Sequence, residues 1–283
     1  RAAAAAAQPE LWFLKHAHMN LNRGVTVHPG PSDCLRAWRE KPSSDQANYV
    51  AQREVQDVLL DDQGRKIVLR VYVLLLVAAA GVQDDDADSD GPAAWALLRR
   101  EFLQKSHGRP YDQSDMNPER HINSSVTHEG VRWCAGSAWP LRDEVWPRIH
   151  SMLADCLQPL LPLAASEAPV GGGGARALAF ELLGIDVLLD KSLRPWLIEF
   201  NTFPDLRPLR GQPEVSRLRA DVIEDVLRAT VDPALRCECL RSSAQDSEAW
   251  QLLAFWPAPI SVGGPGGGDV ENGGRHGEEN QAV

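Results

Sequence analysis

The sequence predicts an α+β fold built from antiparallel sheets with helices packed on them. The chain has 283 residues, of which 43% are hydrophobic, so it can bury a full core. Segments with strand-like alternation and segments with helical spacing follow one another, but without the strict strand–helix–strand rhythm of a doubly wound parallel sheet. The longest apolar run, residues 67–81, contains Arg70. It falls short of the roughly 20 residues that a membrane helix needs, so no membrane span is predicted.

Low-complexity stretches mark the limits of the predicted domain. Residues 1–10 are alanine-rich and residues 257–283 are glycine-rich. We predict a leader and a disordered tail there, because such segments cannot bury enough apolar surface to order themselves. The folded domain is predicted at residues 11–256, with a further low-complexity loop at residues 171–174. No signal-peptide pattern follows Arg1, and we expect the leader to be the end of something longer.

The first half of this domain is predicted to be mostly strands. Residues 11–15 and 24–28 form strands on either side of a polar loop. A short helix follows at residues 33–39, with Ser32 available as its N-cap. Residues 49–55 and the long segment 66–77 then complete the strands of this half.

The second half is predicted to alternate helix, hairpin and helix. Residues 144–154 have helical spacing, because Val145, Ile149 and Leu153 fall on one stripe. A hairpin is predicted at residues 180–201. The closing helix is predicted at residues 215–229, and its apolar positions include Leu218, Val222 and Leu227.

Charge and cysteine content narrow the classes of function. The net charge of −10 argues against a nucleic-acid surface, which draws on clustered lysine and arginine. The acidic residues 84–90 are predicted to be a solvated loop. The cysteines are odd in number and irregularly spaced, which indicates a reducing compartment rather than a disulfide framework. They are Cys34, Cys134, Cys156, Cys237 and Cys239.

The densest chemistry lies in the predicted hairpin. Strand alternation places Glu199 and Asn201 on one face and Trp196, Ile198 and Phe200 on the other. If Leu189 pairs with Trp196, counting back puts Asp186 directly opposite Glu199, with their Cβ atoms about 5 Å apart.

Two facing carboxylates on an apolar hairpin repel each other unless one is protonated or a cation lies between them. A hard divalent cation with oxygen ligands would remove the repulsion, and Mg²⁺ commonly uses a few carboxylates together with substrate phosphates. Asp186, Glu199 and Asn201 are therefore candidate metal ligands. The alternative is the solvent-facing polar side of an ordinary hairpin.

The residues Phe180-Glu-Leu-Leu-Gly-Ile-Asp186, then Pro195-Trp-Leu-Ile-Glu199-Phe-Asn201 and Pro204, resemble the signature of the tubulin tyrosine ligase-like family. The resemblance implies an ATP-grasp fold, with Asp186, Glu199 and Asn201 holding the Mg²⁺ ions that bridge the ATP phosphates. It covers about residues 11–229 and is strongest at residues 180–206 and 52–75. It also identifies the chain as a diverged, N-terminally incomplete member.

The resemblance also implies roles for residues on the nucleotide side. Lys15 is expected to contact the α- and β-phosphates, and Gly24 to let the backbone approach them. Gln52, Arg53 and Val55 lie where the family has the hinge that pairs with adenine. Asn123 is the best match to a contact with the γ-phosphate and metal.

Two further cations resemble residues that face the phosphates. Lys66, Val68, Arg70 and Tyr72 share one face of the strand at residues 66–77 by period-two geometry, and this strand resembles a family strand of the form K-F-D-x-R-x-Y. Val68 stands where the family has Asp. Lys105 resembles an arginine that faces the phosphates, with an exposed helix face as the alternative. Lys66 and Arg70 are two cations on an inward strand, which suits ATP or an acyl-phosphate. Lys66 is therefore a predicted nucleotide-binding residue, and Arg70 and Lys105 are the predicted catalytic residues.

The function that the resemblance implies is ATP-dependent ligation of tyrosine, glutamate or glycine to protein tails, with tubulin as the expected substrate, through an acyl-phosphate. ATP and Mg²⁺ are the implied cofactors, the free amino acid is the second substrate, and the cytoplasm, cytoskeleton or cilium is the implied location. Candidates to bind the acidic tail are Arg194, Arg207 and Arg210, with ordinary surface charge as the alternative.

Two other functions stay open at this point. Val68 and the thinned glycine loop favour a weakly active or inactive member that acts as a microtubule- or protein-binding module. A third possibility is an ATP-grasp ligase acting on small molecules, against which the specificity of the hairpin motif counts. Neither a nucleic-acid partner nor a membrane is expected.

Overall fold

The computed structural model describes residues 10–19, 24–78, 93–118, 121, 132–167, 178–236 and 248–256. Within these residues the chain is α+β with antiparallel sheets, as predicted. Several predictions fall outside them and stay predictions: the leader up to residue 9, the acidic loop, the low-complexity loop at residues 171–174, Asn123, Cys237, Cys239 and the tail from residue 257.

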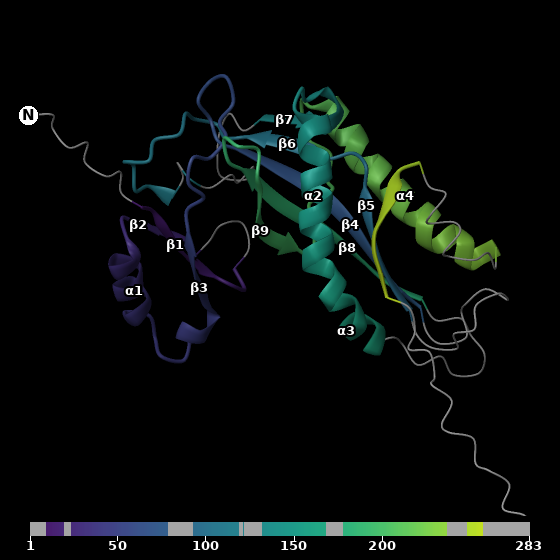
Figure 1. Cartoon of the computed structure of the whole chain (residues 1–283), viewed down its shortest axis with the longest axis horizontal. Helices are drawn as coiled ribbons and strands as arrows, with labels where there is room; N and C mark the ends of the chain where they lie inside the picture. Colours follow the sequence, from purple (N-terminus) through teal and green to yellow (C-terminus); the bar gives the residue numbers. More distant parts are fainter. Residues whose placement is uncertain are drawn as a thin grey trace, which may run out of the picture.

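A small sheet forms the first unit of the structure. Its strands are β1 (Trp12–His16), β2 (Thr26–His28) and β3 (Tyr49–Arg53), in the order β2-β1-β3 and antiparallel throughout. Helix α1 (Pro31–Arg39) and the short 3-10 turn η1 (Gln46–Asn48) connect β2 to β3 (Figure 1).

Helix α1 begins earlier than predicted. Pro31 occupies the first turn, which suits proline because its missing N–H has no helical partner there. Gly30 precedes the helix, and no side chain caps it. The prediction of Ser32 as the N-cap was therefore wrong, because Pro31 starts the helix before Ser32.

A larger antiparallel sheet has β4 (Ile67–Ala78) at its centre. Strand β8 (Leu178–Leu189) pairs along one side of β4, and β9 (Pro195–Asn201) pairs with β8. Along the other side, β6 (Leu103–Ser106) pairs with the beginning of β4 and β5 (Ala93–Arg99) with its end. The outer strands are β7 (Arg132–Ala135) beside β6 and β10 (Trp250–Trp256) beside β5.

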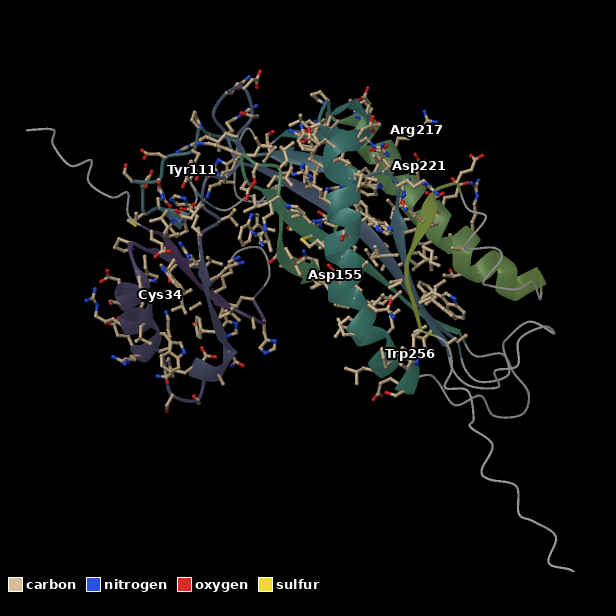
Figure 2. All side chains as sticks on the ribbon, viewed as in Figure 1. Cys34, Tyr111, Asp155, Arg217, Asp221 and Trp256 are labelled. Carbon is tan, nitrogen blue, oxygen red and sulfur yellow. The ribbon has the colours of Figure 1, made fainter. Side chains whose placement is uncertain are left out.

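Helices cover both faces of the large sheet (Figure 1). The helices α2 (Arg142–Leu157) and α3 (Leu161–Ser166) lie on one face, joined by the 3-10 turn η4 (Gln158–Leu160), and η3 (Gly136–Ala138) precedes α2. Helix α4 (Pro213–Arg236) lies on the other face. Figure 2 marks the two units, with Cys34 on α1 and Asp155 on α2. No helix in the described ranges is long and apolar enough to span a membrane.

The alternation of β4 divides the core between these helices. Leu69, Val71 and Val73 are buried in a cluster with the α2 stripe of Val145, Ile149 and Leu153, which confirms that stripe. Tyr72, Leu74 and Leu76 are buried on the α4 side. Of the three apolar α4 positions predicted, Leu218 and Val222 are buried there, whereas Leu227 is 47% exposed.

Four strands and one helix were not predicted, namely β5, β6, β7, β10 and α3. Every residue of β5 is buried, so the strand lacks the polar alternation by which half-buried strands are recognised. The helix considered as the alternative for Lys105 is wrong, because Lys105 lies on β6.

The small sheet is tied to the hairpin of β8 and β9. Val58 and Asp190 form an isolated antiparallel bridge, and the backbone N–H of Leu59 donates to the carbonyl of Leu189 at 2.7 Å. Lys191 N donates to the carbonyl of Asp57. These bonds hold the small sheet beside the beginning of β4.

Candidate active site

The two carboxylates of the hairpin face each other, but through a register different from the one predicted. Leu189 pairs with Pro195, not with Trp196. A β-bulge then adds one residue on β9, and this extra residue restores the pairing of Asp186 with Glu199. Because Trp196 pairs with Leu188, it lies on the face of Asp186 and Glu199, so the predicted facing of Trp196 was wrong.

Arg70 of β4 holds Asp186 in a two-pronged ion pair. Its Nε and Nη2 donate to Oδ1 and Oδ2 of Asp186 at 2.5 and 3.0 Å, across the register pair of β4 and β8. Burial opposes the charge of Asp186, but the charge of Arg70 and its hydrogen bonds hold the Asp186 pKa below its ordinary value. The charge of Asp186 in turn raises the pKa of Arg70 against burial.

The pKa of Glu199 is shifted in the opposite direction to that of Asp186. Burial and the negative charge of Asp186 raise the pKa of Glu199, although Lys15 lowers it in part. The pKa of Asp186 is thus lowered and that of Glu199 raised, as expected of two carboxylates that share one site.

Lys15 and Lys105 approach this pair from two different sheets. Burial lowers the pKa of Lys15, and the charges of Glu199 and Asp186 oppose that effect. Lys105 is 7% exposed on β6, where it pairs in register with Val68 of β4. Burial lowers the pKa of Lys105 to about 8, with Asp186 raising it and Arg70 lowering it. The exposed helix face considered for Lys105 is therefore wrong.

Gly184 allows the side chain of Arg70 to lie across the hairpin. It pairs with Tyr72 on one side and with Asn201 on the other. A Cβ atom at this position would lie 2.7 Å from the Cβ of Pro204 and 3.2 Å from the Cδ of Arg70. The absence of a side chain at Gly184 is thus what lets Pro204 and Arg70 meet there.

Gly184→Ala is therefore expected to lower the free energy of unfolding by about 1 to 3 kcal/mol, because the added methyl group overpacks against Pro204 and Arg70. Urea unfolding followed by circular dichroism measures the change. Gly30→Ala is the matched control, because nothing lies within 4 Å of the Cβ atom there. Equal stabilities of the two variants would contradict the close approach.

The oxygen atoms of this cluster suit a hard divalent cation. Asn201 Nδ2 donates to the carbonyl of Gly184 at 3.2 Å and to Glu199 Oε1 at 3.3 Å. Neither bond uses Asn201 Oδ1 or Glu199 Oε2, so both are placed to serve as ligands beside Asp186. Two carboxylates and an amide oxygen fit Mg²⁺. No cluster of three or more His, Cys, Asp or Glu residues suited to a metal occurs among the residues described.

The predicted hinge has a buried ion pair at its centre. Lys66 Nζ donates to Glu54 Oε1 at 2.7 Å, and both side chains are about 95% buried or more. The hydroxyl of Tyr111 donates to the same oxygen at 2.9 Å. Burial, followed by the charge of Glu54, raises the pKa of Tyr111. Lys66 is therefore engaged with Glu54, a residue to which no role was assigned.

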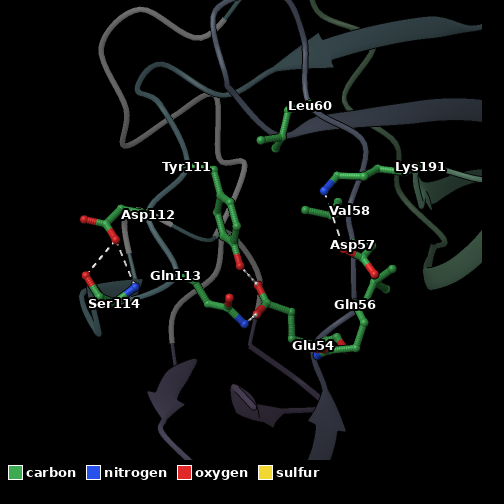
Figure 3. Close-up of a pocket in the computed structure, with 11 residues that line it drawn as sticks. Glu54, Gln56, Asp57, Val58, Leu60, Tyr111, Asp112, Gln113, Ser114 and Lys191 are labelled. Carbon is green, nitrogen blue, oxygen red and sulfur yellow. Dashed lines mark hydrogen bonds and ion pairs between the residues drawn. The ribbon is translucent and has the colours of Figure 1, made fainter. Parts of the chain in front are cut away.

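A pocket of about 430 Å³ adjoins this ion pair. Figure 3 shows Tyr111 and Gln113 pointing at Glu54 from one wall, while Asp57 and Lys191 face each other on the opposite wall. The other predicted hinge residues lie near it: Val55 lines the pocket, Gln52 pairs with Phe13 in the small sheet, and Arg53 forms an ion pair with Glu10.

The remaining predicted residues are dispersed. Gly24 has a φ of +76°, a left-handed conformation that glycine adopts readily, at the start of the β2 segment. Arg207 pairs with Asp205 at 2.8 Å, and Arg194 stacks on Trp196 with its Cζ 4.6 Å from the ring centroid. Arg210 is exposed, and no ion pair involves it within the described ranges.

Comparison with known proteins bears on this hairpin. A family model described as the tubulin-tyrosine ligase family matches residues 141–239. The match runs from α2 through both strands of the hairpin and the whole of α4, and includes Asp186, Glu199 and Asn201.

Residues 141–239 are therefore similar to the tubulin-tyrosine ligase family. Among the relatives of the chain, tubulin glycylase 3B of Drosophila melanogaster is 23% identical over 78% of this chain and 29% of the fly protein. The probable tubulin polyglutamylase TTLL9 of Bos taurus is 27% identical over 71% of this chain and 43% of the bovine protein. Tubulin monoglycylase TTLL3 of Danio rerio is 35% identical over 35% of this chain and 12% of that protein.

The chain spans less than half the length of each of these three relatives. The family match begins after β7, so Lys15, Lys66, Arg70 and Lys105 lie before it. Lys15, Arg70 and Lys105 meet the matched hairpin only through the fold, by way of β1, β4 and β6.

Sequence reasoning missed two residues of this region besides Glu54. Trp133 of β7 pairs in register with Lys105, and Arg219 of α4 lies against the Trp133 ring. Trp133 could have been found only after β6 and β7 had been recognised as neighbours. Arg219 carried a signal, because it is a charged residue one position after the buried Leu218 and three before the buried Val222 in an amphipathic helix.

Proposed function

We propose that this chain is the nucleotide-binding and catalytic part of an ATP-grasp ligase that joins a free amino acid to a carboxylate on a tubulin tail. The observation that carries the proposal is the meeting of Arg70, Asp186 and Glu199 with two lysines from different sheets. The match of residues 141–239 to the tubulin-tyrosine ligase family supports the reaction class, and the names of the relatives mention glycine and glutamate addition to tubulin.

The charged residues of the site could bind both the metal ion and the phosphates that this reaction requires. Asp186, Glu199 and Asn201 would hold Mg²⁺, which supplies charge neutralisation for the phosphates of ATP. Lys15 approaches the carboxylate pair from the small sheet, so it is placed to contact phosphate oxygens on that side. Lys105 and Arg70 approach from the large sheet and would stabilise negative charge on the transferred phosphoryl group.

The proposed reaction needs no nucleophile from the protein. The tail carboxylate accepts the γ-phosphoryl group of ATP, and ADP leaves. The amine of the amino acid then forms a bond to the carbonyl carbon, the bond from that carbon to the phosphate oxygen breaks, and phosphate leaves with the electron pair while the amine loses a proton. The work of the chain is to position these groups and to balance their charge.

Mass spectrometry of tubulin tails tests this proposal. The chain is incubated with tubulin, Mg·ATP and one of glycine, glutamate or tyrosine, and tails gain the mass of one residue if ligation occurs. We expect gain with glycine or glutamate and none without ATP. A wild-type chain that binds Mg·ATP but adds none of the three amino acids would overturn the proposed ligase activity.

A binding module without strong catalysis is the second candidate function. Two observations favour it: Lys66 is engaged by Glu54 at the hinge, and Val68 leaves the face between Lys66 and Arg70 without a carboxylate. Such a module would bind tubulin or another protein with an acidic tail through surface arginines such as Arg194 and Arg210. It would sediment with microtubules without modifying them.

Val68→Asp separates the two candidates. Val68 is half-buried, lies outside the three core clusters of the large sheet and pairs with Lys105, so a carboxylate there would meet a buried cation rather than apolar side chains. We predict that the variant raises ATP turnover or tail ligation several-fold, with a smaller effect on nucleotide affinity, because the carboxylate would orient Lys105 and Arg70. Coupled-enzyme detection of ADP measures turnover. A folded variant with unchanged turnover would show that Val68 does not limit activity.

A further inference from the structure

Trp133, Lys105 and Arg219 lie close together on the β6–β7 side of the site. Trp133 and Lys105 are register partners, and Lys105 Nζ lies 5.2 Å from the centroid of the Trp133 ring. The Cζ atom of Arg219 lies 5.1 Å from the same centroid. Within the described part of the chain, Trp133 Nε1 and Arg219 Nε are buried without a hydrogen-bond partner.

Arg219 is unusual for a buried arginine. It is 2% exposed, and the only hydrogen bond of its side chain among the described residues runs from Nη1 to the carbonyl oxygen of Arg207, at 2.7 Å. No carboxylate lies within ion-pair distance of its guanidinium in the same residues. Burial lowers the pKa of Arg219, Tyr72 and Asp205 raise it, and Arg70 and Arg207 lower it. A buried cation without an ion-pair partner is costly unless an anion joins it.

Different charged groups affect Arg219 and Lys15. The carboxylates that affect Lys15 are Glu199 and Asp186. The groups that affect Arg219 are Tyr72, Asp205 and the two arginines Arg70 and Arg207. Lys105 connects the two regions, because the charges of Asp186 and Glu199 affect it and it contacts the same Trp133 ring as Arg219. An anion held by Arg219 and Lys105 would therefore bind near the carboxylate pair through residues other than Lys15.

We propose that Arg219, Trp133 and Lys105 form a subsite for the α-carboxylate of the free amino-acid substrate. The inference rests on the proposed ligase function. A guanidinium, an ammonium and an indole N–H supply donors on more than one side, which matches the several lone pairs of a carboxylate. Holding the substrate by its carboxylate leaves its amine free to attack. The subsite therefore selects a free α-amino acid over an amine that lacks the acid group.

Comparing each amino acid with its own α-amide tests the subsite directly. The α-amide of glycine is glycinamide and that of glutamate is isoglutamine, and each keeps the amine while losing the negative charge. We expect the wild-type chain to prefer the acid in kcat/KM for tail ligation. In Arg219→Met this preference falls by about tenfold to a hundredfold, as for the loss of a hydrogen bond to a charged group. The KM for ATP changes little.

Matched variants separate recognition from folding. Arg217→Met is the control, because Arg217 lies on the same helix and is exposed, and Figure 2 shows it on the outer side of α4. It should keep the full preference. Arg219→Lys retains the charge and should keep part of the preference if Arg219→Met does not fold. Trp133→Phe retains the ring and removes only the N–H donor, so it should reduce the preference by a smaller factor.

The outcomes distinguish the subsite from the ligase function. An acid-to-amide preference that is the same in wild type, Arg219→Met and Arg219→Lys overturns the subsite while ligation stands. A raised KM for ATP in Arg219→Met with an unchanged preference assigns the anion to the nucleotide and also overturns it. If wild type ligates nothing, thermal shifts in Mg·ADP decide: a larger rise with the acid than with its amide, lost in Arg219→Met, supports the subsite, and equal rises in wild type reject it.

Discussion

Replacing Arg70 by methionine is expected to lower the free energy of unfolding by about 3 to 5 kcal/mol, because Asp186 would then be left buried without its cation. The two side chains are only 14% and 16% exposed, so water cannot replace the lost partner. Urea unfolding of the chain without nucleotide measures the change. The effect on activity is expected to be larger still, because the same guanidinium faces the proposed phosphoryl group.

A second variant shows whether the loss comes from the orphaned charge. The double change Arg70→Met with Asp186→Leu should recover most of the stability, because well-packed apolar residues often replace a buried ion pair at little cost. Arg148→Met is the surface control. Its partner Glu144 and Arg148 itself are both about half exposed, so the loss there should stay below about 1 kcal/mol. A double variant no more stable than Arg70→Met alone would contradict this account of the pair.

Glu199→Gln is expected to abolish most of the rise in melting temperature that Mg·ATP produces. A ligand that binds only the folded state stabilises it by about 2.7 kcal/mol at one hundred times its Kd. The amide of glutamine keeps the size of the side chain but removes the negative charge, so it would leave the proposed cation with one carboxylate fewer. Differential scanning fluorimetry with and without EDTA measures the shift.

Glu181→Gln is the matched control for this experiment. Glu181 lies on β8 of the same hairpin but is exposed and pairs in register with Leu75, away from the carboxylate pair. It should keep the full nucleotide-dependent rise. A folded Glu199→Gln variant with an undiminished rise would remove Glu199 from the metal site. The experiment concerns binding and is independent of whether the chain turns ATP over.

The hairpin shows which features of the site could be predicted from the sequence and which could not. Period-two alternation and a short polar turn were enough to place Asp186 opposite Glu199. The assumed pairing of Leu189 with Trp196 was nevertheless one residue out, and the β-bulge compensated for it. No local pattern in Pro195–Asn201 predicts the bulge. The facing of Trp196 was wrong for that reason.

Ion pairs between residues far apart in the sequence could not be predicted from local patterns either. The register of β4 against β8 joins Arg70 to Asp186 across 116 positions, and only the resemblance to a family linked them beforehand. Lys66 and Glu54 are 12 positions apart, on either side of a turn segment, so neither alternation nor spacing predicted their contact. The strand that carries Lys105 was hidden because β5 and β6 are buried throughout and therefore lack a polar face.

The bulge in β9 also has a consequence for solubility. Strand β9 pairs only with β8 among the described strands, so its outer edge presents backbone groups that could join a strand of another molecule. Pro195 removes one donor from the strand, and the bulge breaks the regular spacing of the rest. Deleting Ile198 would remove the extra residue and leave Asp186 opposite Glu199 in an unbroken ladder. The same deletion would produce a straighter edge strand, and such a chain should self-associate more readily at high concentration.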